Sequence, residues 1–372
     1  ALEQRASDIH IEPADNAYRI RLRIDGVLHP LPDVSPDAGV ALTARLKVLG
    51  NLDIAEHRLP QDGQFTVELA GNAVSFRIAT LACRGGEKVV LRLLQQVSQA
   101  LDVNTLGMQP LQLADFAHAL QQPQGLVLVT GPTGSGKTVT LYSALQSRNT
   151  PDVNICSVED PIEIPLAGLN QTQINPRAGL TFQSVLRALL RQDPDILLVG
   201  EMRDQETVEI GLRGAMTGHL VLTTLHTNDA PSAVTRLTEM GVEPFLLSSS
   251  LAAVMAQRLA RRLCKKCKRQ DTATEAELRT LGVPHMPDTP LPTIWRPVGC
   301  RECANTGYSG RVAIQQVMGV DSTMEDLIAR GATSIDIDKA AKEQGMTTLR
   351  KDGWQKALQG ITSVEEVLRV TV

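Results

Sequence analysis

Residues 131–138 read Gly131-Pro132-Thr133-Gly134-Ser135-Gly136-Lys137-Thr138 and match the phosphate-loop pattern GxxxxGK[ST]. An apolar run, residues 125–130, comes directly before this loop, and the sequence from Lys137 onward is compatible with a helix. Glycines in such a loop let consecutive backbone N–H groups converge on phosphate oxygens at the positive end of the helix. A chance match would lack this order of strand, loop and helix. We therefore predict a nucleoside triphosphate site, in which Lys137 neutralises the β- and γ-phosphates and the Thr138 hydroxyl binds Mg²⁺.

Short apolar runs of the same kind recur later in the chain, at residues 154–158, 196–199 and 219–225, with helical segments between them. Continuous apolar runs of this length are typical of buried parallel strands. A succession of such strands and helices predicts a parallel α/β core that begins at about residue 109.

The first hundred residues have a different pattern. Residues 18–24 alternate between apolar or aromatic side chains and arginines, and they end in a turn at Asp25-Gly26. This pattern is typical of a half-buried strand and a hairpin. Residues 38–56 carry apolar side chains at a helix-compatible spacing. Further strand-like runs follow at 64–69, 73–80 and 88–94. We expect a small α+β domain, followed by a polar linker at residues 95–104.

We therefore divide the chain into an N-terminal α+β domain, a linker, an α/β core, a subdomain with four cysteines and a C-terminal helical region. In this order, the parts cover residues 1–100, 101–108, 109–263, 264–318 and 319–372.

Composition places the chain among ordinary globular proteins, because 42% of its 372 residues are apolar and 21% are charged. The net charge of −4 lacks the basic excess of a dedicated nucleic-acid binder. No run approaches the roughly 18 apolar residues of a membrane span, and no charged-then-apolar leader opens the chain, so we expect a cytoplasmic protein. The chain begins at Ala1 and not at a methionine, so we also expect it to be a fragment.

Three acidic clusters follow the phosphate loop, and phosphoryl transfer needs carboxylates that position water and hold the metal. The cluster from Glu159 to Glu163 follows a predicted strand, which places it near the carboxyl edge of the sheet; a solvated acidic turn is the alternative. The next strand ends in Gly200-Glu201, with glycine where a metal-binding aspartate usually stands. Asp193 and Asp195 precede that strand and are interpreted as a turn.

Two histidines mark the ends of the apolar run 219–225. His219 begins the run and His226 follows it, so their side chains point to opposite faces of a regular strand. A lone histidine is more often structural than functional, but ligands in α/β proteins bind at strand ends. Both histidines are therefore candidates for the phosphate site.

The six cysteines fall into two groups. Cys83 and Cys156 stand alone among apolar neighbours, whereas the others form two CxxC pairs with 32 residues between them, Cys264-x-x-Cys267 and Cys300-x-x-Cys303. Four thiolates in two such pairs close a tetrahedral Zn²⁺ site, and a reducing cytoplasm disfavours disulfides. Because no coordination position stays open, we expect the metal to stabilise a subdomain and not to catalyse.

Seven of the twelve residues from 258 to 269 are Arg or Lys. We favour a solvated helix end that supports the zinc thiolates electrostatically, because charge runs are usually solvated. Contact with acidic membrane lipids is the alternative.

With these motifs in order, the chain resembles the secretion ATPases of type II secretion and type IV pilus assembly from end to end. The resemblance rests on two N-terminal motifs and a later signature, on a family Asp box and atypical Walker B, and on a two-part His box. These are Ser7-Asp8-Ile9-His10-Ile11-Glu12-Pro13, Arg23-Ile24-Asp25-Gly26-Val27-Leu28, Leu59-Pro60-Gln61-Asp62-Gly63, Glu159 to Glu163, Gly200-Glu201-Met202-Arg203-Asp204, and Thr217-Gly218-His219 with Leu225-His226-Thr227. Residues 307–311 also fit, but residues 312–316 depart from the family's usual acidic ending.

The resemblance implies a RecA-like P-loop core and a PAS-like N-terminal domain. It also implies that Glu163 polarises the attacking water, that Glu201 supports the Mg²⁺ shell, and that His219 and His226 sense or position the γ-phosphate region. A tetracysteine zinc element is typical of the assembly ATPases of this family and not of its retraction motors.

Two arginines reach the nucleotide from the N-terminal domain in this family, and the matching positions are Arg77 and Arg92. A guanidinium group there stabilises the charge that builds on the transferred phosphoryl group. From the residues alone, both would be interpreted as solvated strand positions.

The resemblance thus implies a homo-hexameric motor, peripheral at the cytoplasmic face of the inner membrane. It would hydrolyse ATP to drive pilin or pseudopilin assembly through inner-membrane platform and docking proteins. A nucleic-acid motor is one alternative, disfavoured by the net charge and by the 3% of aromatic residues, which leave few stacking platforms. A non-hydrolysing scaffold is another, suggested by Gly200 in the place of the aspartate.

Overall fold

A computed structural model describes residues 2, 4, 6–69, 71–94, 101–286 and 289–371. The chain forms two compact units, Ala1–Gln99 and Ala100–Val372. Of the predicted linker at residues 95–104, residues 95–100 lie outside the described residues. The rest includes a short 3₁₀ turn, Val103–Thr105, and the Val103 side chain is buried in the core of the second unit.

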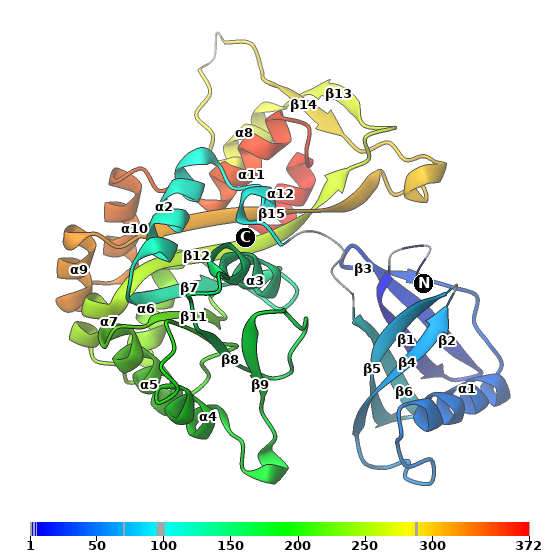
Figure 1. Ribbon diagram of the computed structural model, residues 1–372. Coiled ribbons are helices and arrows are strands. Elements are labelled where there is room, and N and C mark those ends of the chain that lie inside the picture. The colour runs from blue at the N-terminus through cyan, green and yellow to red at the C-terminus, as the bar shows by residue number, and fades with distance from the viewer. Residues whose placement is uncertain are drawn as a thin grey trace. The chain divides into compact units, whose positions relative to one another are not determined.

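The N-terminal unit is a six-stranded antiparallel sheet with one helix against it, as Figure 1 shows in blue. The order of the strands is β3-β2-β1-β6-β5-β4. The elements are β1 (Ala6–Ala14), β2 (Ala17–Ile24), β3 (Val27–Pro30), α1 (Pro36–Leu49), β4 (Gln61–Leu69), β5 (Asn72–Cys83) and β6 (Gly86–Leu94).

Helix α1 packs on one face of this sheet, where Leu46 joins Ile11, Ile78 and Leu91 in a buried cluster. The helix ends at Leu49, earlier than the spacing over residues 38–56 indicated. The end is set by Gly50, whose N–H bonds back to Leu46 O. Because side chains alternate along a strand, the neighbours of Ile78 and Leu91 point to the opposite face of the sheet.

The C-terminal unit is built on a seven-stranded sheet in the order β15-β12-β7-β11-β10-β8-β9. All neighbouring strands are parallel except β15, which is antiparallel to β12. The strands are β7 (Gly125–Thr130), β8 (Ile155–Glu159), β9 (Leu169–Gln173), β10 (Ile196–Val199), β11 (Leu220–Leu225), β12 (Leu251–Leu263) and β15 (Tyr308–Gly319). The predicted parallel α/β core is therefore confirmed.

Strand β15 belongs to this main sheet, although the sequence analysis placed it in the four-cysteine subdomain. It pairs with β12 from Ala253–Gly319 to Leu263–Tyr308, so the two strands form one long ribbon. What lies between them is a smaller insertion made of β13 (Arg269–Thr272), α8 (Glu275–Leu281), β14 (Thr293–Arg296) and the 3₁₀ turn Arg301–Cys303.

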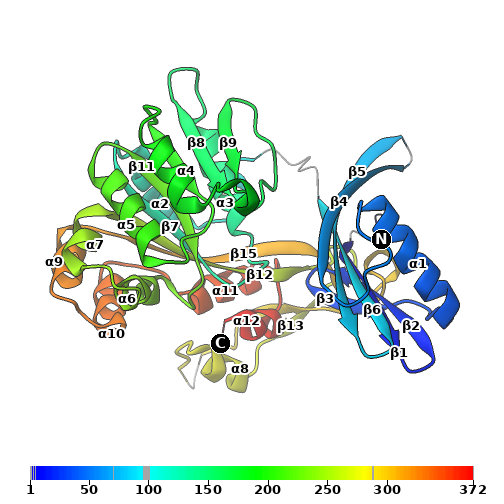
Figure 2. The ribbon, with the colours of Figure 1, turned by 90° about the horizontal axis from the view of Figure 1, so that it is seen from below.

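Helices cover both faces of the sheet (Figures 1 and 2). They are α2 (Pro110–Gln121), α3 (Lys137–Arg148), α4 (Phe182–Leu189), α5 (Gln205–Met216), α6 (Ala230–Glu239), α7 (Pro244–Ser250), α9 (Ser322–Ala329), α10 (Ser334–Glu343), α11 (Leu349–Leu358) and α12 (Val364–Val370). In the described part of the chain, none of the helices combines the length and the apolar character that a membrane span needs.

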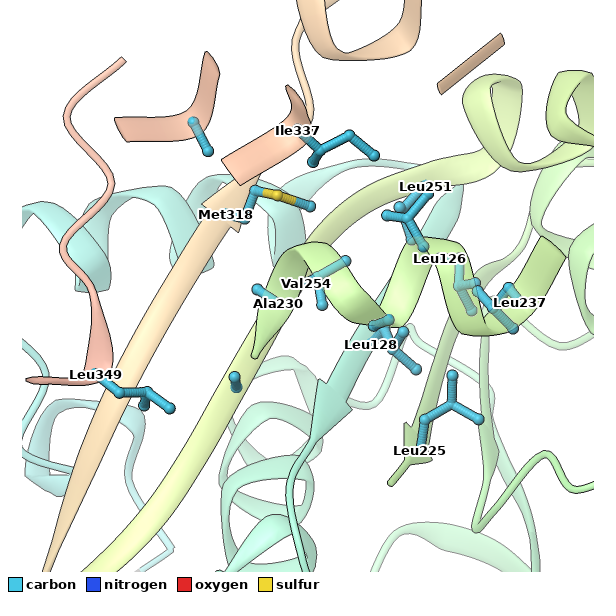
Figure 3. Packing of buried hydrophobic residues seen from close by; sticks show 14 of the residues in the cluster. Leu126, Leu128, Leu225, Ala230, Leu237, Leu251, Val254, Met318, Ile337 and Leu349 are labelled. Atoms are coloured by element: carbon cyan, nitrogen blue, oxygen red, sulfur yellow. The ribbon is translucent and has the colours of Figure 1, made fainter. Parts of the chain in front are cut away.

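Strand β7 shows how the sheet divides the core into two layers. Leu126 and Leu128 lie in one buried cluster with β12, α6 and the C-terminal helices, part of which Figure 3 shows. Val127 and Val129 point the other way, into a cluster with α2 and α3. Every residue of β7 is buried, which explains why its sequence is continuously apolar and not alternating.

Helix α12 is attached to β12 by a buried carboxylate. Glu366, which is 1% exposed, accepts hydrogen bonds from the Arg261 N–H (2.9 Å) and Arg261 Nη2 (2.6 Å). Arg369 Nε and Nη2 donate to the same carboxylate at 2.8 and 2.7 Å. Burial acts to raise the pKa of Glu366, but the bonds from Arg369 and Arg261 outweigh it and lower this pKa to about 2.

This attachment predicts a loss of stability in acid. Because the folded pKa of Glu366 lies below the ordinary 4.5, its contribution is complete above about pH 4.5 and is lost as the pH falls toward 2. We expect Glu366→Gln to lower the free energy of unfolding at neutral pH by on the order of 3 kcal/mol and to flatten its acid dependence. Urea unfolding of both proteins between pH 7 and pH 3 tests this. Parallel pH curves would contradict the assignment.

Candidate nucleotide site and four-cysteine cluster

The phosphate loop lies between the end of β7 and the start of α3, at the carboxyl edge of the parallel sheet. Gly136 caps α3 in a left-handed conformation (φ 87°), and Gly131 has a φ of 148° where the chain leaves β7. These backbone angles explain the glycines of the pattern. The Ser135 hydroxyl inside the loop is buried and has no hydrogen-bond partner among the described residues, as expected for a loop that wraps around a polar ligand.

Lys137 folds back over the loop, and its Nζ donates to Gly131 O at 2.7 Å and to Pro132 O at 3.2 Å. Burial lowers the pKa of Lys137, whereas the carboxylates of Glu201 and Glu163 act to raise it. Both acids are therefore close enough to influence the lysine charge. Thr138 lies in the first turn of α3, directly after Lys137.

Glu201 and His226 lie together where β10 and β11 end. The His226 Nε2 is 3.3 Å from Glu201 Oε1, and Arg203 Nη2 is 2.8 Å from Glu201 Oε2. The Thr224 hydroxyl donates to Gly200 O at 2.7 Å, which ties the two strand ends to each other. The sequence motifs around Glu201 and His226 thus meet at one edge of the sheet.

His219 lies at the other end of β11, and this corrects the expectation that both histidines belong to the phosphate site. The His219 carbonyl accepts from Gly125 N at the beginning of β7, and its Nδ1 is 2.9 Å from Gly214 O at the end of α5. Since β11 and β7 run parallel, His219 and the loop are separated by the length of a strand, roughly 20 Å at about 3.3 Å per residue. In such sheets, ligands bind at the carboxyl ends of the strands, and His219 lies at the amino end of β11. A position at either end of a strand was therefore not enough to assign a residue to the phosphate site.

The two glutamates of the Asp box differ in their surroundings. Glu159 is buried and accepts hydrogen bonds from the Tyr142 hydroxyl, from Ser157 Oγ (2.5 Å) and from Gln171 Nε2 (3.3 Å). Burial, and then the bond to Glu159, raise the pKa of Tyr142, so this tyrosine stays neutral and links α3 to β8. Glu163 is exposed, and of the two it is the carboxylate that can approach a bound nucleotide and water.

Arg77 and Arg92 face each other across β5 and β6 in the N-terminal unit. They follow the alternation away from α1, so they lie on the face of the sheet that the helix does not cover. Arg92 Nε donates to Asp8 Oδ1 at 2.9 Å, and Arg77 Nη2 is 4.0 Å from Asp62 Oδ1. The two arginines are therefore neighbours on paired strands, and their partly exposed guanidinium groups contact acids on the two flanking strands, Asp8 on β1 and Asp62 on β4.

The basic run 258–269 does not form the expected helix end, because residues 258–263 belong to strand β12. Some of its side chains contact other parts of the fold and others are exposed. Arg261 binds Glu366 and stacks over the Tyr308 ring at 4.1 Å, and Lys268 Nζ donates to Gly360 O at 2.7 Å and lies 4.5 Å from the Trp295 ring. These residues stabilise the fold. The exposed members are Arg262, Lys265, Lys266 and Arg269.

The four cysteines of the CxxC pairs converge at the end of the β12–β15 ribbon. Their Sγ atoms all lie within 4.8 Å of one another. The separations are 3.8 Å for Cys264–Cys300, 3.8 Å for Cys267–Cys303 and 3.7 Å for Cys300–Cys303. A tetrahedral ion with Zn–S bonds of about 2.3 Å places its sulfurs about 3.8 Å apart, so this donor set fits Zn²⁺.

Backbone N–H groups point at these sulfurs. Those of Cys300 and Gly307 donate to Cys303 Sγ at 3.2 and 3.3 Å, and that of Gly299 donates to Cys267 Sγ at 3.3 Å. Burial acts to raise the pKa of Cys303, but these N–H groups and the neighbouring thiols lower it to about 7. Burial and the neighbouring thiols instead raise the pKa of Cys267 to about 11. Of these two cysteines, Cys303 is therefore the one whose surroundings favour the thiolate, which is the form that binds metal.

Two residues of β12 that the sequence analysis did not assign to the site lie under the phosphate loop. They are Gln257 and Arg258, which follow the residue paired with Thr130 at the end of β7. Arg258 donates to Gln257 O (3.0 Å) and to Asn228 O (2.7 Å). In the sequence, the one indication was a glutamine at the end of an apolar run. Only the pairing of β12 with β7 shows that this glutamine lies next to the phosphate loop.

A phosphate loop at the carboxyl edge of a parallel sheet, with a glutamate and a histidine at the next strand ends, defines a P-loop ATPase. A solved structure supports this class: the pilus retraction motor PilT with bound ADP superposes with a TM-score of 0.65 at 26% identity, over 100% of this chain and 94% of that one. The chain belongs to the family described as "Type II/IV secretion system protein", which matches residues 1–369.

Curated relatives carry names from pilus assembly and from secretion. The chain is 68% identical to the "Protein transport protein HofB homolog" of Escherichia coli K12, over 100% of the chain and 79% of that protein. It is 48% identical to the "Type IV pilus assembly ATPase PilB" of Myxococcus xanthus, over 99% of the chain but only 65% of that protein. It is also 48% identical to the "Type II secretion system protein E" of Klebsiella pneumoniae, over 100% of the chain and 73% of that protein.

Proposed function

We propose that this chain is the ATP-hydrolysing part of a homo-hexameric motor that drives the assembly of pilin or pseudopilin subunits. The observation that carries the proposal is the occurrence of the phosphate loop and the four-cysteine cluster in one chain. Nearly all of this chain is also similar to part of a pilus-assembly ATPase and part of a type II secretion protein. Equal identity to these two relatives leaves both kinds of machine within the proposal.

In the proposed reaction, the loop N–H groups and Lys137 bind the β- and γ-phosphates, and Thr138 binds Mg²⁺. Glu163 polarises the attacking water, and Glu201, held beside His226, orders the metal shell. The metal supplies charge neutralisation on the transferred phosphoryl group. His226, at the end of β11, can respond to the γ-phosphate because it contacts the Glu201 carboxylate.

Arg77 and Arg92 are proposed to reach the same nucleotide from an N-terminal unit, in the charge-stabilising role of guanidinium groups. The pairing of Arg77 with Arg92 across β5 and β6 supports this, because it places two cations on one face of the sheet. Asp8 holds Arg92 in place through its 2.9 Å bond. Hydrolysis would then depend on the relative position of the two units, which is how a motor couples chemistry to motion.

We place the motor in the cytoplasm, peripheral at the inner membrane, with platform and docking proteins as partners. Zn²⁺ would stabilise the insertion between β12 and β15. The exposed residues Arg262, Lys265, Lys266 and Arg269 are the ones available to acidic lipids. Turnover measured with and without anionic vesicles, in the wild type and in a variant with these four residues changed to serine, tests the lipid contact. Equal stimulation of both would exclude it.

Glu163→Gln tests the hydrolytic function. We expect turnover to fall by about 10²- to 10⁴-fold, because an amide cannot accept the proton of the attacking water. The affinity for ATP should stay within a few-fold, because the negative charge of Glu163 contributes no attraction to the phosphates. Phosphate release and equilibrium nucleotide binding are the measurements.

The matched control is Glu243→Gln, an exposed carboxylate at the start of α7 that makes no capping bond. It should keep wild-type turnover. Equal, background rates for the wild type and for Glu163→Gln would favour a non-hydrolysing scaffold.

A further inference from the structure

Gln257 is a buried polar side chain that lies next to the phosphate loop. It is 2% exposed and directly follows Ala256, which pairs with Thr130 at the end of β7. The side chain therefore lies under the loop that begins at Gly131. A buried amide is costly unless its donor and acceptor are both satisfied, so its partners show what the residue is for.

Both ends of the Gln257 amide bind the phosphate-loop segment. Its Nε2 donates to Ser135 O at 2.7 Å, and its Oε1 accepts from the Thr140 hydroxyl at 2.8 Å. The orientation of the amide is determined by chemistry, because a carbonyl can only accept a hydrogen bond. The loop is thus held to β12 from below, through the loop backbone and through the first turn of α3.

The glycines of the loop rest on the same residue. A Cβ at Gly136 would lie 2.9 Å from Gln257 Nε2, and a Cβ at Gly131 would lie 2.4 Å from Gln257 O. Neither position has room for a side chain. Gln257 therefore touches the loop near its beginning and near its end.

The bond to Ser135 O has a direct consequence for phosphate binding. The Ser135 carbonyl and the Gly136 N–H belong to one planar trans peptide, so they point in opposite directions. When Gln257 holds the carbonyl on the β12 side, the Gly136 N–H is directed to the other side of the loop. That is the side on which the N–H groups of a phosphate loop bind oxygens.

We propose that Gln257 is a positioning residue of the nucleotide site, which holds the Ser135–Gly136 peptide in the orientation that presents its N–H to the phosphates. It acts through the loop and does not touch the nucleotide. The proposal goes beyond the ATPase role of the family and depends only on nucleotide binding at this loop, not on the motor function.

The Gln257 amide is itself supported from β15. Gln315 Nε2 lies 3.4 Å from Gln257 Oε1, and the Gln315 N–H donates to Asp352 Oδ2 at 2.8 Å. Asp352 forms a buried ion pair with Lys356 at 2.6 Å, so α11 is part of the same network. This chain of contacts limits how far the amide can rotate when its bond to Ser135 is lost.

Gln257→Met removes the hydrogen bonds to Ser135 and Thr140, together with the longer one from Gln315, and keeps the volume of the side chain. We expect the Kd for a fluorescent ADP, and the KM for ATP, to rise about tenfold or more, while kcat changes by less than about threefold, because the loop binds ground state and transition state alike. Gln112→Met is the matched control. Gln112 is 3% exposed and also donates to a backbone carbonyl (Gln315 O, 2.7 Å) and accepts from a donor (Gln109 N, 2.8 Å), but not in the loop.

The control should lose comparable stability and keep the wild-type Kd for ADP. A Kd for Gln257→Met within twofold of the wild type would overturn the proposal. So would an equal rise in Gln112→Met, because the effect would then not depend on the two bonds between Gln257 and the loop segment. Because the readout is binding of ADP, failure of hydrolysis or of pilus assembly would leave this test intact.

Gln257→Glu supplies an independent measurement. An ionised carboxylate would face the Ser135 carbonyl without a proton to donate, whereas the protonated acid restores the donor and acceptor pattern of the amide. We expect the affinity of this variant for ADP, relative to the wild type, to recover by at least about threefold between pH 8 and pH 6, since burial raises the pKa of a carboxyl group. A ratio that does not change with pH would contradict the role of the donated bond.

Discussion

We expect Lys137→Ala to lower ATP turnover by at least about 10²- to 10³-fold, which is the loss that follows from removing one charge-stabilising group of a phosphoryl-transfer site. The lysine is the first residue of α3, and its Nζ lies over the loop, 2.7 Å from Gly131 O. In that position the ammonium group lies beside the loop that would bind the phosphates. The neighbouring cation Arg258 is not placed to replace it, because Arg258 is bonded to backbone carbonyls below the loop.

Two controls make this result specific. Lys339→Ala removes an exposed lysine of α10 and should leave turnover unchanged. Lys137→Arg keeps the charge, but its larger planar group does not fit a position held by two loop carbonyls, so we expect less than about a tenth of wild-type activity. Phosphate release at saturating ATP is the measurement. If Lys137→Ala kept a third of the wild-type rate, the loop would not be the catalytic nucleotide site.

We expect Cys303→Ser to abolish zinc binding by the four-cysteine cluster. We expect bound zinc, measured by mass spectrometry of the purified protein, to fall from one per chain to near zero. Cys303 Sγ is buried and receives the N–H groups of Cys300 and Gly307, so a serine hydroxyl cannot replace the thiolate. Structural zinc sites contribute on the order of 10 kcal/mol to the folding of small domains, and most of this is lost here from the insertion between β12 and β15.

The loss should be seen as a lower unfolding midpoint, by about 5 °C or more, and as faster proteolysis of residues 264–307. ADP binding should change by less than a few-fold, because Cys264 follows the end of β12, about 23 Å beyond Gln257 at about 3.3 Å per residue, and the cluster has no open coordination position. Cys83→Ser, which replaces an exposed thiol of the N-terminal unit, is the control and should keep one zinc per chain. Full zinc content in Cys303→Ser would contradict the assignment.

Local patterns predicted much of this protein because their physical causes are local. The loop from Gly131 to Thr138 depends on glycine conformations and on a helix start within eight residues. The apolar runs at β7, β10 and β11 reflect strands that are buried on both faces, and the CxxC spacing brings two sulfurs of each pair together before any tertiary contact forms. The fold class, the position of the phosphate loop and the clustering of the four cysteines could therefore be predicted from the sequence alone.

Tertiary pairing decided the rest, because it depends on partners that are distant in the chain. The run from Leu251 to Leu263 carried no signal that it lies beside β7, more than a hundred residues earlier, and so Gln257 was not recognised as a support of the loop. The same reason explains His219: its motif is local, but which edge of the sheet it occupies follows from the parallel direction of β11 and β7. By itself the sequence determined which residues can bind phosphate and metal. Which side chains stand behind the loop and hold its peptides in place was determined only when β12 and β15 joined the sheet, since a buried amide acquires its role from the groups packed around it.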